Sequence, residues 1–124
     1  MPSLTLALSG KLLDVITGRA AFAPQLPLRL ALMTQIGDDT APGVEVAGGS
    51  YGRQPVTFGP QVSKAARNSA AFAFTAMPEV SVVGGELYDD SGLRMLFGPF
   101  SKIINCNNGD DIPFDVGALA LTIA

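Results

Sequence analysis

The spacing of apolar residues predicts one helix followed by a series of short strands. Over residues 3–17, apolar side chains recur every three to four positions, at Leu4, Leu8, Leu12 and then Val15 or Ile16. This stripe is typical of an amphipathic helix, with Ser3 as its N-cap and Gly18 as its stop. Leu6 and Leu13 widen the apolar face, so we expect the helix to lie against its own sheet or a neighbouring protein.

The next apolar segment, residues 26–34, alternates with the period of a half-buried strand. One face of it carries four leucines, Leu26, Leu28, Leu30 and Leu32, and the other carries Arg29, Ala31 and Met33. Pro27 lacks a backbone N–H, so we expect the strand to start near Leu28 or to lie on a sheet edge.

The rest of the chain reads as strands separated by turns. Further strands are predicted near 69–76, 80–88, 93–97, 100–104, 112–116 and 119–123, with short extended pieces at 44–46 and 56–58. Gly84-Gly85 predicts a bulge, Gly98-Pro99 predicts a strand break, and residues 60–68 read as a loop. We therefore expect a mainly β fold: an antiparallel β-sandwich or jelly-roll-like domain of about seven or eight short strands. We expect a single compact domain made up of an N-terminal helical arm (1–18) and a β-sandwich domain (19–124), and the sequence contains no internal repeat.

Composition narrows the classes of partner. Charged residues make up 15% of the chain, against about 25% in a typical soluble domain, and the net charge is −3. So little polar surface predicts that a partner covers some apolar surface. The negative charge and the scattered Lys and Arg argue against nucleic acid. We expect no membrane span, since no uncharged apolar run approaches about 18 residues. We also expect no signal peptide, since the first residues lack its basic start and apolar stretch.

The missing residue types argue against catalysis. The chain has no His and a single cysteine, Cys106. Histidine is the commonest general base near neutral pH, and a lone thiol without a His partner lacks the usual activation. We therefore expect a non-enzyme without a cofactor, in which Cys106 packs as a small residue.

Three acidic pairs could in principle bind a cation. They are Asp38-Asp39, Asp89-Asp90 and Asp110-Asp111. Each lies beside turn residues, where Asp side chains cap their own backbone, so a turn role is favoured over a Ca²⁺ site or a glycosidase pair. The glycine-rich stretch 48–52 lacks the spacing of phosphate-binding loops.

Several segments carry a resemblance to a known family. Residues 12–22 (LLDVITGRAAF) and 45–59 (EVAGGSYGRQPVTFG) resemble small virion proteins of tailed bacteriophages, which are labelled tail fibre proteins or capsid-coating subunits. The strand 28–34, the Asn-Ser-Ala-Ala segment 68–71 and the turns at 89–92 and 108–110 fit the same pattern. Residues 85–88 are bulkier than the family pattern.

The resemblance implies a non-enzymatic virion subunit, made in the host cytoplasm, that binds the major capsid protein or tail proteins and copies of itself, for example as a trimer. A short chain without a coiled-coil or collagen-like shaft favours capsid decoration, and a minor tail or tail fibre protein is the alternative. The interface residues we expect are Leu4, Leu8 and Leu12 on the helix and Tyr51, Arg53 and Gln54 in the 45–59 stretch. Arg53 could instead bond nearby turn carbonyls.

Two other functions stay open. A carbohydrate- or receptor-binding module at the tail tip would use exposed aromatic and acidic side chains, for which Tyr51, Tyr88 and Asp89 are the candidates. A hydrolase is the least favoured class, because no His is present.

Overall fold

The described part of the chain is one helix and ten short strands. The computed structural model describes residues 3–122, so the expected strand residue Ile123 lies outside it. The elements are β1 (Ser3–Leu4), α1 (Leu6–Ile16), β2 (Leu28–Gln35), β3 (Val44–Glu45), β4 (Gln54–Val56), β5 (Ala65–Arg67), β6 (Phe72–Phe74), β7 (Val80–Tyr88), β8 (Arg94–Cys106), β9 (Ile112–Phe114) and β10 (Ala120–Thr122). The predicted mainly β fold with an N-terminal helix is confirmed, with more strands than expected.

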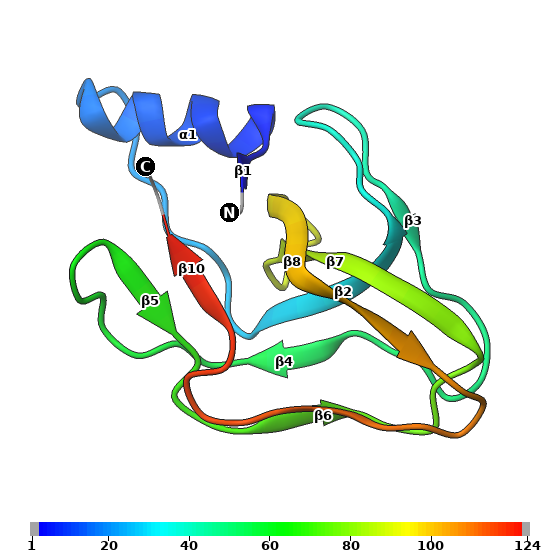
Figure 1. Cartoon of the computed structure of the whole chain (residues 1–124). Helices are drawn as coiled ribbons and strands as arrows, with labels where there is room; N and C mark the ends of the chain where they lie inside the picture. The colour runs from blue at the N-terminus through cyan, green and yellow to red at the C-terminus, as the bar shows by residue number, and fades with distance from the viewer. Residues whose placement is uncertain (1–2, 123–124) are drawn as a thin grey trace.

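The strands form one large sheet and two small ones. The large sheet has the order β1-β8-β7-β2-β3, and β4 pairs with β2 as well. β5 pairs with β10, and β6 pairs with β9. Every named strand pair is antiparallel. Figure 1 shows α1 across one end of this arrangement, beside β1 and β8.

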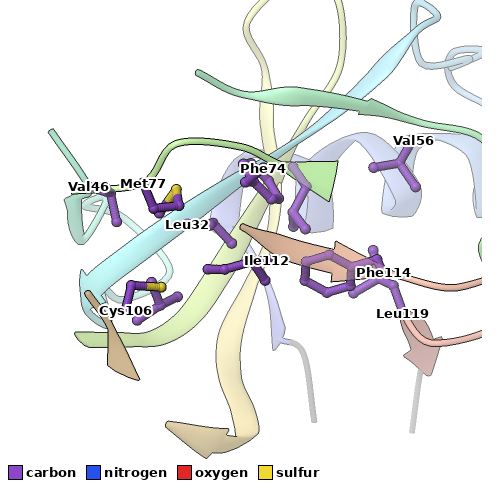
Figure 2. Close-up of a cluster of buried hydrophobic side chains, with 11 residues drawn as sticks. Leu32, Val46, Val56, Phe74, Met77, Cys106, Ile112, Phe114 and Leu119 are labelled. Atoms are coloured by element: carbon purple, nitrogen blue, oxygen red, sulfur yellow. The ribbon is translucent and has the colours of Figure 1, made fainter. Parts of the chain in front are cut away.

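The main core lies between the large sheet and the small sheets. It contains eleven buried side chains, among them Leu32, Phe74, Met77 and Phe114 (Figure 2). Rings of Phe72 and Phe114 stack with centroids 4.7 Å apart. This core is assembled from strands distant in the sequence, so the aromatic residues serve packing, as their place on apolar strand faces predicts.

The helix is shorter than predicted. It begins after Thr5, whose side-chain oxygen accepts a hydrogen bond from the Leu8 N–H, so Thr5 and not Ser3 is the N-cap. Ser3 and Leu4 form β1 instead and pair with β8. The stop at Gly18 is confirmed: its φ is +74°, and the N–H groups of Gly18 and Arg19 bond to Val15 and Asp14, which is a Schellman motif. The division into an arm (1–18) and a β domain (19–124) stays a prediction.

β2 is buried on both faces, whereas the alternation of its residues predicted that only one face would be buried. Leu30 and Leu32 belong to the main core, while Ala31 and Met33 are buried beside Tyr88 on the opposite face. Leu26 lies before the strand and is exposed. On the second face Ala31 and Met33 cluster with Tyr88 of β7, whose ring lies under Arg53, and no pattern within the strand reveals these distant neighbours.

β8 runs without the predicted break at Gly98-Pro99. Pro99 pairs with Gly84 of β7, and beyond Phe97 the outer edge of β8 pairs with no other strand of residues 3–122. Proline is tolerated on such a free edge. The bulge predicted at the paired glycines is confirmed by a register shift between Val82 and Gly84. A Cβ on Gly84 would lie 2.2 Å from the Gly98 oxygen, so this close approach requires glycine.

The segment 60–68 contains a strand that the sequence did not predict. Residues 65–67 form β5, which pairs with β10 at the end of the described chain. Asn68 holds the two together: its side chain donates to the Ala70 and Asp115 carbonyls and accepts from the Leu119 N–H. A three-residue strand formed by long-range pairing leaves no periodicity to detect.

Candidate interaction surfaces

The predicted interface leucines pack against the chain's own sheet, and one of them, Leu4, belongs to β1 and not to the helix. Leu8 is buried with Leu87 and Met95, and Leu4 and Leu12 pack against the same cluster. In the folded chain these side chains contribute to internal packing. The most exposed large apolar side chains of α1 are Leu6, Leu13 and Ile16, at 59%, 60% and 79%, while Val15 is 43% exposed.

The Tyr51 hydroxyl contacts the edge of β2 at Leu32, between the residues of β2 that pair with β4 and those that pair with β3. Its ring stacks on Phe74 with centroids 5.9 Å apart. Its hydroxyl accepts the Leu32 N–H at 3.0 Å and donates to Glu45 Oε2 at 2.6 Å. Burial, and then this bond to Glu45, raises the pKa of Tyr51 above its ordinary value. Tyr51 is therefore a structural link between the core and the outer face of the sheet.

Arg53 bonds a carboxylate rather than turn carbonyls. Its Nε and Nη2 donate to the two oxygens of Glu45 at 3.0 and 2.9 Å. The guanidinium also stacks over the Tyr88 ring, 3.9 Å from its centroid. Gln54 lies in β4, and its side chain donates to the Gly52 carbonyl. The structure thus brings Tyr51 and Arg53 together around Glu45, while the α1 leucines lie in a separate cluster.

Glu86 and Arg94 form a buried ion pair next to Tyr88, and the sequence did not predict it. Glu86 is 1% exposed and accepts from Tyr88 Oη at 2.8 Å, from the Gly43 N–H at 2.9 Å and from Arg94 Nε at 2.9 Å. Arg94 Nη2 lies 2.8 Å from the same oxygen as an ion-pair contact, without hydrogen-bond geometry. Burial, and then the bond to Glu86, raises the pKa of Tyr88 to about 12. The available signal was a lone charge at Glu86 in an otherwise apolar strand.

This network also positions the start of the helix. The loop at residues 37–43 is tied to Glu86 through the Gly43 N–H, and the Asp39 carbonyl of the same loop accepts the Leu6 N–H at 2.8 Å. Thr5 Oγ1 donates to the Arg94 carbonyl at 2.7 Å. The orientation of α1 therefore depends on β7, β8 and this loop together.

The acidic turns use their oxygens for backbone capping. Asp38 Oδ1 accepts the N–H groups of Thr40 and Ala41, and Asp89 accepts those of Gln25, Ser91 and Leu93. Asp110 and Asp111 accept the Asn107 and Ala76 N–H groups. Within residues 3–122, no group of three His, Cys, Asp or Glu side chains is placed to hold a metal ion. The turn role favoured from the sequence matches these bonds.

The candidate carbohydrate residues are engaged within the chain. Tyr88 is 9% exposed and lies beneath Arg53, and Asp89 is 5% exposed and caps its turn. The Tyr51 hydroxyl is occupied by Leu32 and Glu45. These three side chains leave no open polar and aromatic platform for a sugar in this conformation.

We expect stability to fall as the pH is lowered. Burial raises the pKa of Glu45, but hydrogen bonds from Arg53 and Tyr51 outweigh it and hold that pKa below its ordinary value. For Asp89, bonds from Ser91, Gln25 and Leu93 likewise outweigh burial and lower the pKa. A carboxyl with a depressed folded-state pKa contributes stability above its unfolded pKa of about 4, and the contribution is lost as the pH falls through the folded pKa.

Urea denaturation across the acidic range measures this effect. The free energy of unfolding should be level from about pH 7 to pH 5 and fall below that. An Asp89→Asn variant should be less stable at neutral pH and show a shallower acid slope. Equal slopes for the two proteins would contradict the role of Asp89.

The comparison with known proteins decides the family. A family model described as podophage GP4 fiber I protein gp80 matches residues 3–122. The chain belongs to this family. No curated protein matches it. The gp80 family is one of phage structural proteins, so the resemblance seen in the sequence is confirmed, and a structural role in the virion follows. Within residues 3–122 of this gp80-family chain, no helix is long and apolar enough to cross a membrane.

Proposed function

We propose that the chain is a structural subunit of a fibre on a podophage particle, where it binds copies of itself and neighbouring virion proteins. The match to the fiber I family over residues 3–122 carries this proposal. The exposed aliphatic side chains of α1 support it, since large apolar side chains gathered on one face mark contact surfaces. Assembly would proceed by burial of apolar area, with many copies providing avidity.

The chemistry of the chain supports a role without catalysis. The sequence has no His, and the single cysteine, Cys106, is buried in the main core. Burial, and then the nearby Asp110 carboxylate, raises the pKa of its thiol, which keeps it protonated and unreactive. Charged side chains on the outer face of the large sheet are paired, Glu45 with Arg53, Glu86 with Arg94 and Arg29 with Asp90.

A second candidate is a capsid decoration protein that binds the major capsid protein. The residue pattern favours it, because neither a heptad repeat nor a collagen-like shaft is present in these residues.

Labelling of intact particles separates the two placements. We expect antibodies against the purified chain to label tail-associated fibres, with few copies per particle on a quantitative gel. Dense labelling over the head would favour decoration instead. Absence of the chain from purified particles would overturn both, and particles prepared without it serve as the control.

A further inference from the structure

The outer face of α1 carries a continuous apolar stripe. Leu6 and Leu13 are seven residues apart and therefore lie on the same side of the helix, and Ile16 follows one turn after Leu13. All three are more than half exposed. Other exposed aliphatic side chains, such as Ile103, Val62 and Val116, come from separate elements or loops. Single exposed apolar residues need no explanation, whereas this stripe does.

Gly10 lies in the middle of the stripe. Glycine within a helix costs about 1 kcal/mol relative to alanine, so a packing reason is expected. A Cβ at Gly10 would meet nothing within 4 Å in the chain itself, so packing inside the chain does not require glycine. A second helix crossing at this point would, because small side chains at the contact shorten the distance between helix axes.

The charges of α1 favour an antiparallel neighbour. Its first turn contains no acidic residue and its last turn no basic one. Asp14 instead places a carboxylate in the last turn, beside the negative end of the helix dipole. In an antiparallel pair centred near Gly10, Asp14 of each helix lies beside the first turn of the other, where negative charge is favourable. Parallel packing would gather the Asp14 carboxylates and the negative helix ends together.

We propose that the outer face of α1 binds the same face of a second copy, so that two helices pair antiparallel about a twofold axis. Leu6 of one copy then lies against Leu13 of the other, with the two Gly10 residues at the crossing point. The inference rests on the proposed function, which it deepens by naming the contact surface. A twofold contact favours a dimer as the assembly unit, in place of the trimer that the resemblance suggested.

Analytical ultracentrifugation of the purified chain tests the pairing. We expect a dimer at about 100 μM, with a dissociation constant in the micromolar range. Leu13→Asp should give a monomer. Ile103→Asp is the matched control, because Ile103 is 61% exposed against 60% for Leu13 but lies in β8; this variant should remain dimeric.

Two further variants separate loss of contact from loss of fold. Gly10→Leu replaces glycine by a better helix former in open space, so thermal unfolding of the monomer should occur at a higher temperature while the dissociation constant rises about tenfold or more. Asp14→Lys should stabilise the end of its own helix yet weaken the dimer about fivefold.

The outcomes distinguish this inference from the proposed function. A wild-type chain that stays monomeric at this concentration, a dimer that survives Leu13→Asp, or a dimer lost in Ile103→Asp would overturn the helix pairing. If such a protein is still found in virion fibres, the proposed function stands without it. If the chain is absent from particles but dimerises as expected, the pairing stands and the proposed function fails.

Discussion

Replacing Glu86 by alanine is expected to destabilise the fold by about 3–5 kcal/mol. Glu86 is buried beneath Tyr88 and accepts two bonds in addition to its pair with Arg94. Without the carboxylate, the largely buried Arg94 guanidinium loses its counter-charge, and the Gly43 N–H and the Tyr88 hydroxyl lose their acceptor. An uncompensated buried charge is among the most costly single changes in a protein.

Urea denaturation of Glu86→Ala and two comparison proteins measures this. Asp90→Asn removes the solvent-exposed pair with Arg29 and should cost no more than about 1 kcal/mol. A double variant, Glu86→Met with Arg94→Met, removes both charges and should recover most of the lost stability. A cost for Glu86→Ala as small as that of the exposed pair would show that the buried pair does not support the fold.

The same substitution should also weaken dimer formation through α1. Glu86 holds the 37–43 loop, whose Asp39 carbonyl accepts the first helical N–H at Leu6. The position of the proposed contact surface therefore depends on the hydrogen bonds of Glu86 and of the 37–43 loop as well as on the helix itself. Through these bonds Glu86, which lies outside the proposed contact, would influence assembly.

Phe74→Ala is the second substitution with a large expected effect, a loss of about 3–5 kcal/mol. Phe74 is 1% exposed and contacts three other rings, those of Tyr51, Phe72 and Phe114. Truncation removes the transfer free energy of the ring and leaves a cavity where the large sheet meets β6 and β9. The strands in contact with β6 are β9 of the same small sheet and β4 of the large sheet, so they are held by different pairings and cannot both move in to fill it.

Thermal or urea unfolding of Phe74→Ala checks this expectation. Phe74→Leu retains most of the apolar volume and should cost clearly less. Ile103→Ala, at an exposed position on β8, should change stability by less than about 0.5 kcal/mol. Equal losses at Phe74 and Ile103 would place the energetic core elsewhere.

The candidate sites show how far residue patterns lead. The family could be inferred from the sequence. The 45–59 stretch does form a defined structure, in which Tyr51 and Arg53 both bond Glu45. The partners of these residues could not be inferred, because Glu45, Tyr88 and Glu86 come together only when β2, β3 and β7 pair. The orientation of α1 was equally hidden: leucines lie on both of its faces, so periodicity does not say which face the sheet covers.

The sequence by itself determined the elements that depend on local chemistry. The helix stop at Gly18, the bulge at the paired glycines and the capped acidic turns follow from backbone preferences within a few residues. Tertiary structure alone decided the continuity of β8 through Pro99, the three-residue strand β5, the burial of Glu86 and the exposed face of α1. Each of these depends on which distant strand lies alongside, and long-range pairing leaves no trace in the neighbouring residues.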